Sequence, residues 1–266
     1  MPPVRVAVVG NLSLDRVDGA PPRAGGPPLY AGRALAALGV PALVAAKLGE
    51  NARPLLAALR KLELPVEVRY GRATATYAFS YDGERRTMEV LELGEPWRPD
   101  EVDWVAGARW VHVGALFQGE FPEATLAALA AHARLSFDGQ GLVRPARVGP
   151  LELEPEPDWS FLRHISVLKL SEEEALVLVG RLDVRSLGEL GVPEVVVTLG
   201  SRGCLVLARR TLVHVPAEPL AGIDPTGAGD AFAAAYMVER SRRVAPRTAA
   251  QRATGFVGSL LARTKR

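Results

Sequence analysis

The chain has 266 residues, of which 32 are lysine or arginine and 30 are aspartate or glutamate, so its formal net charge is +2. This length suits one large domain, or one domain with a small appendage. Because the charges nearly balance, no strong field of one sign favours nucleic acid or a membrane surface as the partner, and we expect a small molecule. A hydrophobic content of 48% is ordinary for a globular protein and excludes a disordered chain.

The composition also bears on the cellular compartment. Cys204 is the only cysteine, so no disulfide can form within the chain. The amino terminus has no charged and then apolar leader, and no apolar run is long enough to cross a bilayer. We therefore expect a cytoplasmic protein without a membrane segment. The cations are almost all arginine, which fits either a thermophile or a GC-rich genome.

The amino-terminal part predicts two buried strands and two helices. Val4–Val9 is a continuous apolar run that ends at Gly10, which is typical of a strand buried on both faces of a parallel sheet. Leu29–Leu38 has apolar residues at helical spacing. A second strand over Ala42–Ala46 and a helix over Pro54–Leu62 follow.

Residues 66–93 interrupt this pattern with three extended segments, Val66–Tyr70, Thr74–Tyr81 and Arg86–Leu93. Asp82-Gly83 lies between the last two segments and is a strong signal for a two-residue hairpin turn. A short antiparallel ribbon inserted into alternating strands and helices has no parallel neighbour to join, so we expect it to project from the main sheet as a lid. Residues 12–24 are candidates to contribute to this lid, and residues 1–65 and 94–266 would form the main domain.

Strands and helices alternate again after residue 93. The expected elements are strands at 110–113, 135–137, 166–170 and 195–199, an antiparallel edge at 204–208 and 212–215, and helices at 123–132, 171–179, from about 227, and at 248–262. This is the βαβ rhythm of an open, mostly parallel sheet with helices on both faces, so the predicted fold class is α/β.

The most informative segment covers residues 222–232 and reads Gly-Ile-Asp-Pro-Thr-Gly-Ala-Gly-Asp-Ala-Phe. Gly227 and Gly229 let the backbone turn tightly at a helix start, where unpaired N–H groups and the helix dipole favour an anion. Asp230 would repel a phosphate bound there unless it has another role, and accepting a proton from an attacking hydroxyl is such a role. The structural alternative is a glycine-rich helix start with a favourable first-turn aspartate.

The residues at 224–230, Asp-Pro-Thr-Gly-Ala-Gly-Asp, resemble the carboxyl-terminal signature of the ribokinase, or PfkB-like, family of carbohydrate kinases. Gly25-Gly26 before the helix at 29–38, and Asn11 and Asp15 after the first strand, resemble the amino-terminal pattern of that family. Neither a Walker phosphate loop nor Gly-x-Gly-x-x-Gly follows the first strand, which argues against the two commoner nucleotide-binding designs. The resemblance covers nearly the whole chain and implies a ribokinase-like fold with a small β lid over the acceptor sugar.

The resemblance also implies roles for individual residues. Asp230 would be the catalytic base, and the backbone amides of Gly227, Ala228 and Gly229 would hold the charge that develops on the transferred phosphoryl group. Residues at positions that bind acceptor hydroxyls in relatives are Asn11, Asp15 and Gly26. Residues implied on the nucleotide side are Lys169, Ser171, Thr198, Gly200, Gly203, Asp224 and Thr226.

Ser171-Glu172-Glu173-Glu174 stands where the family has Asn-x-x-Glu, so Glu174 would help to position magnesium, usually through water. Ser-x-x-Glu before an apolar helix is also a capping box in its own right, which is the structural alternative. The glycine turn at 200–203 is, read alone, only the end of a strand. The four histidines show no metal-ligand spacing, and we expect structural or surface roles for them.

Three residues bear on the identity of the acceptor. Tyr30 occupies the position at which ribokinase-like members commonly carry a sugar-contacting asparagine, which does not favour ribose. The segment at 138–144 and the motif at 171–174 look more like the inositol kinase branch of the family. Gln140 and Arg144 are therefore candidates for contacts with the acceptor or with phosphate, and myo-inositol is the leading acceptor.

The resulting hypothesis is an ATP-dependent, magnesium-requiring kinase that transfers the γ-phosphoryl group to a hydroxyl of a small sugar or polyol. A monovalent cation is a further candidate cofactor. The alternatives are a nucleoside kinase or another sugar kinase, acting on ribose, fructose or 2-keto-3-deoxygluconate, and a non-catalytic sugar- or nucleotide-binding protein. An intact Asp230 weighs against the last, because a binder needs no base there. Exposed strand edges in the lid would allow a homodimer through it.

Overall fold

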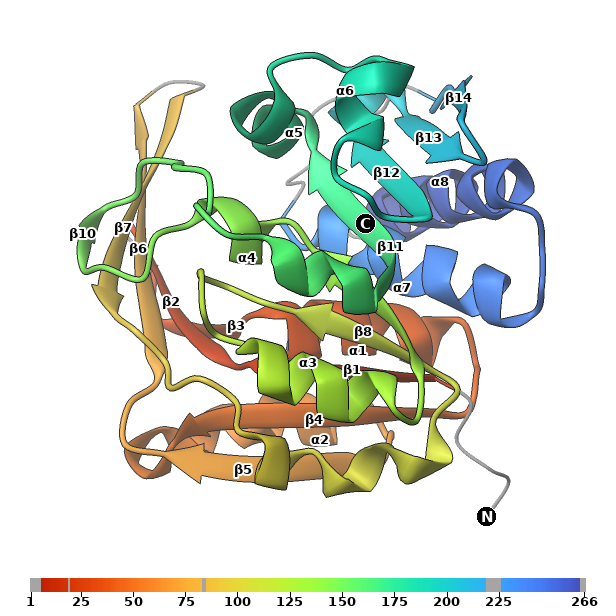
Figure 1. Cartoon of the computed structure of the whole chain (residues 1–266). Coiled ribbons are helices and arrows are strands. Elements are labelled where there is room, and N and C mark those ends of the chain that lie inside the picture. The colour runs from red at the N-terminus through yellow and green to blue at the C-terminus, as the bar shows by residue number, and fades with distance from the viewer. Residues whose placement is uncertain (1–5, 19, 83–84, 219–225, 264–266) are drawn as a thin grey trace.

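The computed structural model describes residues 6–18, 20–82, 85–218 and 226–263. Their strands form a nine-stranded and a five-stranded sheet (Figure 1). In spatial order the larger sheet contains β14 (Thr211–Val215), β13 (Cys204–Ala208), β12 (Glu194–Thr198), β11 (Ile165–Ser171), β9 (Arg134–Asp138), β8 (Trp110–Gly114), β1 (Val6–Asn11), β4 (Ala42–Gly49) and β5 (Val66–Gly71).

The larger sheet is parallel from β5 to β12, while β13 and β14 add an antiparallel edge. Every residue of β1 is buried, because helices cover both faces of the sheet, and this explains its uninterrupted apolar sequence. The parallel register brings the polar residues at the carboxyl ends of neighbouring strands together. Asn11 is level with Lys47, Lys169 with Asp138, and Ser171 with Thr198.

Helices lie on both faces of this sheet, as predicted (Figure 1). One face is covered by α1 (Pro27–Ala37), α2 (Leu56–Arg60), α7 (Ala228–Ser241) and α8 (Pro246–Arg263). The other face is covered by α3 (Glu123–Ala130), α4 (Gln140–Val143), α5 (Glu172–Val179) and α6 (Val184–Gly188). Short 3₁₀ helices occur at Glu50–Leu55, Pro99–Glu101, Asp103–Gly107, Ser160–His164 and Gly200–Arg202.

The smaller sheet contains, in spatial order, β10 (Gly149–Pro150), β7 (Arg85–Glu92), β6 (Ala75–Asp82), β2 (Ser13–Val17) and β3 (Arg23–Gly25). It stands beside the larger sheet, on the left in Figure 1. β6 and β7 pair antiparallel as expected, although Gly83 of the predicted turn lies outside the described residues. A third apolar cluster joins Tyr77 and Phe79 of this sheet to Leu116.

The structure corrects the predicted extent of the strand lid. Residues 66–71 were expected to project from the main sheet, but β5 is the edge strand of the larger sheet and pairs parallel with β4. Val66 and Val68 pack against the main core, so the strand completes a β4–α2–β5 unit. The ribbon also has a parallel neighbour, since β2 pairs parallel with β6.

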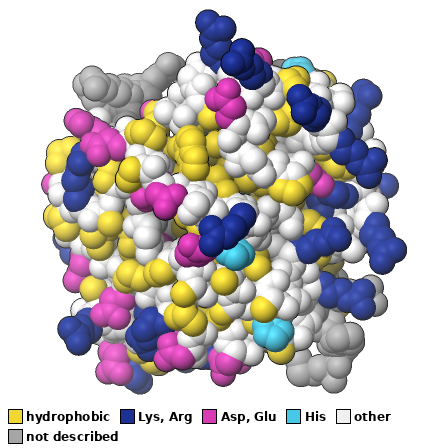
Figure 2. Space-filling model, in the orientation of Figure 1, with side chains coloured by type: hydrophobic (Ala, Val, Ile, Leu, Met, Phe, Trp, Pro, Cys, Tyr) yellow, Lys and Arg dark blue, Asp and Glu magenta, His cyan; other side chains and the backbone are white. Residues whose placement is uncertain are grey.

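Two surface properties bear on the class of partner. On the face drawn in Figure 2, acidic and basic side chains both occur among apolar ones, and arginine and lysine side chains are more frequent on the right. Among the described helices, none combines the length and the apolar character needed to span a membrane.

Candidate active site

A cavity of about 150 Å³ lies where the carboxyl ends of the large sheet face the small sheet. In the large sheet β1 lies between β4 and β8, so the strand order runs outward from β1 in both directions. Ligands of open α/β sheets bind at the carboxyl ends of the strands at such a switch point. The cavity is lined by Ser13, Asp15, Gly26, Pro27, Tyr30, Tyr77, Phe79, Met88, Leu116, Gln140, Arg144, Thr226, Gly227, Gly229 and Asp230. Most of the residues predicted for acceptor binding and catalysis are therefore neighbours in space.

The start of α7 has the properties expected of an anion-binding site. Gly227 is the N-cap residue with a left-handed φ of 79°, and as a glycine it has no side chain with which to cap the helix. The N–H groups at a helix start lack partners within the helix, and here the N-cap residue's own side chain takes none of them. A Cβ added to Gly227 would lie 2.4 Å from Cδ1 of Tyr30, and one added to Gly229 would lie 2.9 Å from Nζ of Lys169. Both glycines are needed for these close approaches.

Asp230 lies in the first turn of α7 and is only 9% exposed. Its Oδ1 atom is buried and has no hydrogen-bond partner among the described residues. Burial, together with the negative charge of Asp138, raises the pKa of Asp230 to about 7, although Lys169 and Arg144 act in the opposite direction. A carboxyl group with this pKa can accept a proton near neutral pH and release it again.

Lys169 and Asp138 form a buried ion pair, with Nζ 3.2 Å from Oδ2. Burial lowers the pKa of Lys169, but the carboxylates of Asp138, Glu174 and Asp230 outweigh this effect, and the net shift is upward. The ammonium group therefore stays charged beside Gly229. Asp138 was not singled out from the sequence, although its position directly after a short apolar run at 135–137 was the available signal.

His112, Asp138 and Asp230 each place one possible metal-ligand atom within 4.8 Å of the others. His112 is fully buried on β8, and burial lowers its pKa to about 4, so the imidazole is neutral at pH 7. Its Nδ1 atom lies 3.3 Å from Oγ of Ser136. The absence of metal-ligand spacing in the sequence concealed this cluster, because strands and a helix from distant segments assemble it.

Ser171 and Glu174 form the capping box that the sequence offered as the structural alternative. The backbone N–H of Glu174 donates to Oγ of Ser171 (3.2 Å), and the backbone N–H of Ser171 donates to Oε2 of Glu174 (2.7 Å). Glu174 is only 6% exposed, and burial raises its pKa while Lys169 opposes the rise. Its carboxylate is thus held at the start of α5, with Oε2 already engaged.

Thr198 and the glycine turn at 200–203, which were predicted on the nucleotide side, lie at the carboxyl end of β12. Thr198 is level with Ser171, and neither Thr198 nor the turn lines the cavity. Oγ1 of Thr198 donates to the carbonyl of Leu170. Gly200 and Gly203 both have positive φ, and a Cβ on Gly203 would lie 2.0 Å from the carbonyl oxygen of Val215. Backbone geometry alone therefore requires glycine at 203. Ala228 is not a lining residue, and Asp224 lies outside the described residues.

The acceptor side of the cavity combines polar groups with apolar walls. Asp15 is 5% exposed and accepts a hydrogen bond from Oγ of Ser13 (2.7 Å). Nε of Arg144 and the hydroxyl of Tyr77 are buried without a hydrogen-bond partner in the described part of the chain. Ser13 and Tyr77 were not predicted as site residues; the alternating aromatic residues of β6 were the available signal.

Asn11 does not line the cavity. It is 1% exposed, and its Nδ2 atom donates to the carbonyl of Glu95 (3.1 Å). The structure therefore places Asn11 behind the cavity wall, unlike Asp15 and Gly26, which the sequence had grouped with it.

Comparisons with known proteins identify the family of the chain. A model of the pfkB family of carbohydrate kinases matches residues 13–263. A fructokinase of Salmonella thompson is 32% identical over 149 residues, which cover 52% of this chain and 66% of that protein. A ribokinase of Bacillus subtilis is 31% identical over 123 residues, which cover 46% of this chain and 40% of that protein. These matches thus span less than two thirds of either relative.

Solved structures resemble nearly the whole chain. A pyrophosphate-dependent kinase in the ribokinase family, complexed with a pyrophosphate analog and myo-inositol, matches with a TM-score of 0.84 at 22% identity, over 97% of this chain and 95% of that one. Ribokinase of Arabidopsis thaliana, complexed with ribose and ATP, matches with a TM-score of 0.74 at 20% identity, over 98% and 93% of the two chains. The ribokinase-like fold predicted from the sequence is confirmed.

Proposed function

Because the chain belongs to the PfkB family of carbohydrate kinases, we propose that it transfers the γ-phosphoryl group of ATP to a hydroxyl of a small sugar or polyol. Asp230 carries the proposal. Its Oδ1 has no hydrogen-bond partner among the described residues and is buried at the cavity, at the same helix start as the amides of residues 227–229. A base and an anion-binding helix start therefore adjoin one small polar cavity.

In this proposal the acceptor hydroxyl donates its proton to Asp230 as its oxygen attacks the phosphoryl group. The amides of Gly227, Ala228 and Gly229 and the ammonium of Lys169 stabilise the charge that develops on that group. Phe79 and Met88 from the small sheet cover the cavity with apolar surface, which keeps water from competing as the acceptor.

The donor set of this site fits magnesium, because Mg²⁺ prefers carboxylate oxygens and buried carboxylates cluster here. Glu174 would hold the ion through water, since its Oε2 atom already serves the capping box. The ion would neutralise charge on the donor phosphates. Donor contacts are assigned to Lys169, Ser171, Thr198, Gly200, Gly203, Asp224 and Thr226, and a monovalent cation would act as a further cofactor.

The leading acceptor is myo-inositol. The lining offers hydrogen-bonding side chains at Asp15, Gln140 and Arg144, which suit a polyol, and Tyr30 fills space beside Gly227. Ribose and fructose are the alternative acceptors, since the relatives matched above include a ribokinase and a fructokinase. Pyrophosphate is the alternative donor, because a structural neighbour of this fold is described as pyrophosphate-dependent.

The test measures phosphorylation of myo-inositol, ribose, fructose and nucleosides with ATP or pyrophosphate as donor. We expect one acceptor and one donor to dominate, and we expect Asp230→Asn to lower the rate by about 10² to 10⁴. Asp183→Asn is the matched control, because Asp183 caps the start of α6 at the surface and asparagine caps equally well. No turnover by the wild type, or an Asp230→Asn variant as fast as the wild type, contradicts the proposal and favours a non-catalytic binder.

The small sheet also supports the proposal of a homodimer through the lid. Its outer strands, β10 and β3, end the strand order on either side and offer edges to a second copy. Light scattering of the purified protein tests this: a monomeric mass at micromolar concentration contradicts it.

A further inference from the structure

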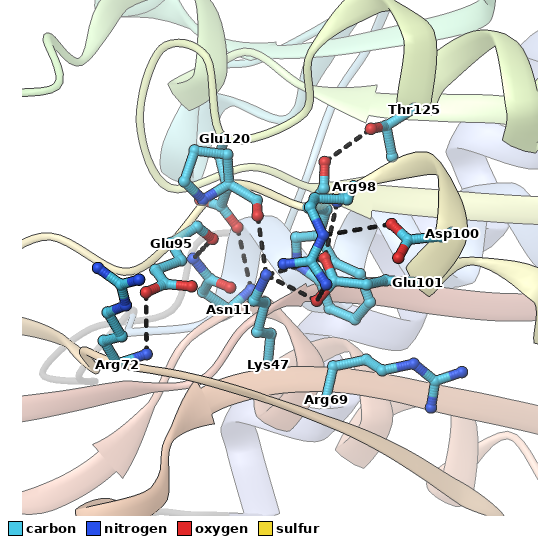
Figure 3. A network of polar contacts seen from close by, with 12 residues as sticks. Asn11, Lys47, Arg69, Arg72, Glu95, Arg98, Asp100, Glu101, Glu120 and Thr125 are labelled. Carbon is cyan, nitrogen blue, oxygen red and sulfur yellow. Dashed lines mark hydrogen bonds and ion pairs between the residues drawn. The ribbon is translucent and has the colours of Figure 1, made fainter.

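The cavity lies between two sheets, so its width depends on how the small sheet is held on the large one. The connections from β1 to β2, from β5 to β6 and out of β7 pass close to one another. A polar cluster, buried except for the partly exposed Glu95, lies at this place, and we call it the junction (Figure 3). It consists of Asn11, Lys47, Glu95, Glu101 and Glu120.

Lys47 fastens the segment after β7 to the end of β4. Its side chain is 1% exposed, and Nζ donates to both carboxylate oxygens of Glu101 (2.9 and 2.8 Å) and to the carbonyl of Pro96 (2.8 Å). The carboxylate of Glu101 also accepts from the backbone N–H of Arg98 (2.7 Å). One buried ammonium group thus holds residues 96–101 in place.

Asn11 and Glu120 fasten the same segment to the end of β1. Nδ2 of Asn11 donates to the carbonyl of Glu95, and a Cβ on Gly94 would lie 2.4 Å from that nitrogen. Glu120 accepts from the backbone N–H groups of Asn11 (3.0 Å) and Leu116 (2.6 Å). Leu116 lines the cavity, so Glu120 links the cavity wall directly to the junction.

Glu95 ties together the two connections that carry the β6–β7 hairpin. Its Oε1 atom accepts from the backbone N–H of Arg72, in the β5–β6 connection (2.9 Å). Its backbone carbonyl accepts from Asn11. Both ends of the hairpin are therefore held at its base by one residue.

We propose that the junction sets the position of the small sheet over the cavity, and that Asn11, Lys47 and Glu95 are positioning residues for the acceptor. This inference rests on the proposed kinase function. Asp15, Tyr77 and Met88 belong to the small sheet, whereas Asp230 belongs to α7. A small change in sheet orientation would therefore separate the acceptor contacts from the base, although none of the junction side chains needs to touch the acceptor.

The experiment compares Lys47→Met and Glu95→Ala with the wild type. In both variants we expect amide hydrogen exchange to become faster than in the wild type in β6 and β7, and to change less in β8 and β9. We also expect the KM of the acceptor that the wild type uses best to rise about tenfold or more, with the KM of the donor within about twofold. Glu95→Gln should behave like the wild type, because its amide oxygen can still accept from Arg72.

Arg240→Met is the matched control, because it breaks another largely buried ion pair, with Glu194, away from the junction. It should lower stability without changing acceptor KM. If Lys47→Met and Glu95→Ala match this control in both exchange and KM, the positioning role is wrong. Should Lys47→Met fail to fold, Glu95→Ala decides alone. If the wild type phosphorylates no acceptor, the proposed function fails, and hydrogen exchange in β6 and β7 still decides whether the junction holds the small sheet.

Discussion

The ring of Tyr30 covers Gly227 so closely that a Cβ on the glycine would lie 2.4 Å from Cδ1 of the tyrosine. Gly227 also has a φ of 79°, a backbone conformation that residues other than glycine rarely adopt. The start of α7 is therefore specified twice, once by its own backbone and once by a residue of α1.

Gly227→Ala should lower the free energy of unfolding by about 1–3 kcal/mol for the backbone conformation alone, with a further loss from the collision with Tyr30. Turnover should fall with it, since the amides of the first turn must move. Adding Tyr30→Ala should recover the part due to the collision and not the part due to φ. Urea unfolding of the single and double variants measures both parts of the stability loss. Gly255→Ala, with open space around the glycine in α8, should be neutral or stabilising.

The pKa of Asp230, about 7, predicts the pH dependence of the reaction. The base must be ionised to accept a proton, so kcat/KM should fall as the pH drops through about 7 and level off above it. A profile of kcat/KM from pH 5 to pH 9 measures the midpoint. A rate that stays constant down to pH 5 would show that Asp230 is not the base, or that its pKa is not raised.

Two variants should move that midpoint in opposite directions. Lys169 lowers the pKa of Asp230 and Asp138 raises it, so Lys169→Met should shift the profile to higher pH and Asp138→Asn to lower pH. Lys169→Met also leaves the Asp138 carboxylate buried without its partner, which should cost about 3–5 kcal/mol of stability. The double variant should regain much of that stability. Shifts in the same direction would contradict the assigned electrostatics.

Glu120 should make stability depend on pH. Burial raises its pKa from an ordinary 4.5 to about 8, against the hydrogen bonds from Leu116 and Asn11. The folded state therefore keeps the proton over a range in which the unfolded chain has lost it, and this contribution to stability declines as the pH rises from about 4.5 to 8. Urea unfolding at several pH values should show a decline that Glu120→Gln lacks. Parallel curves for the two proteins would contradict the shift.

Most of the fold could be predicted from the sequence, because its signals are local. An apolar run such as Val4–Val9 specifies a strand buried on both faces, here β1. Ser171 and Glu174, three residues apart, specify the cap at the start of α5. The place of Val66–Gly71 was predicted wrongly, because an extended segment does not reveal which strand it pairs with. That pairing depends on Val66 and Val68 reaching the main core.

The candidate site divides in the same way. The helix start with Gly227, Gly229 and Asp230 was visible in the sequence because glycine conformation and the first-turn amides are properties of a short segment. The partnership of Asp230 with Asp138, and the use of Asn11 at the junction rather than in the cavity wall, were not visible. Burial and the register of distant strands create both, and these properties arise only when the chain is folded.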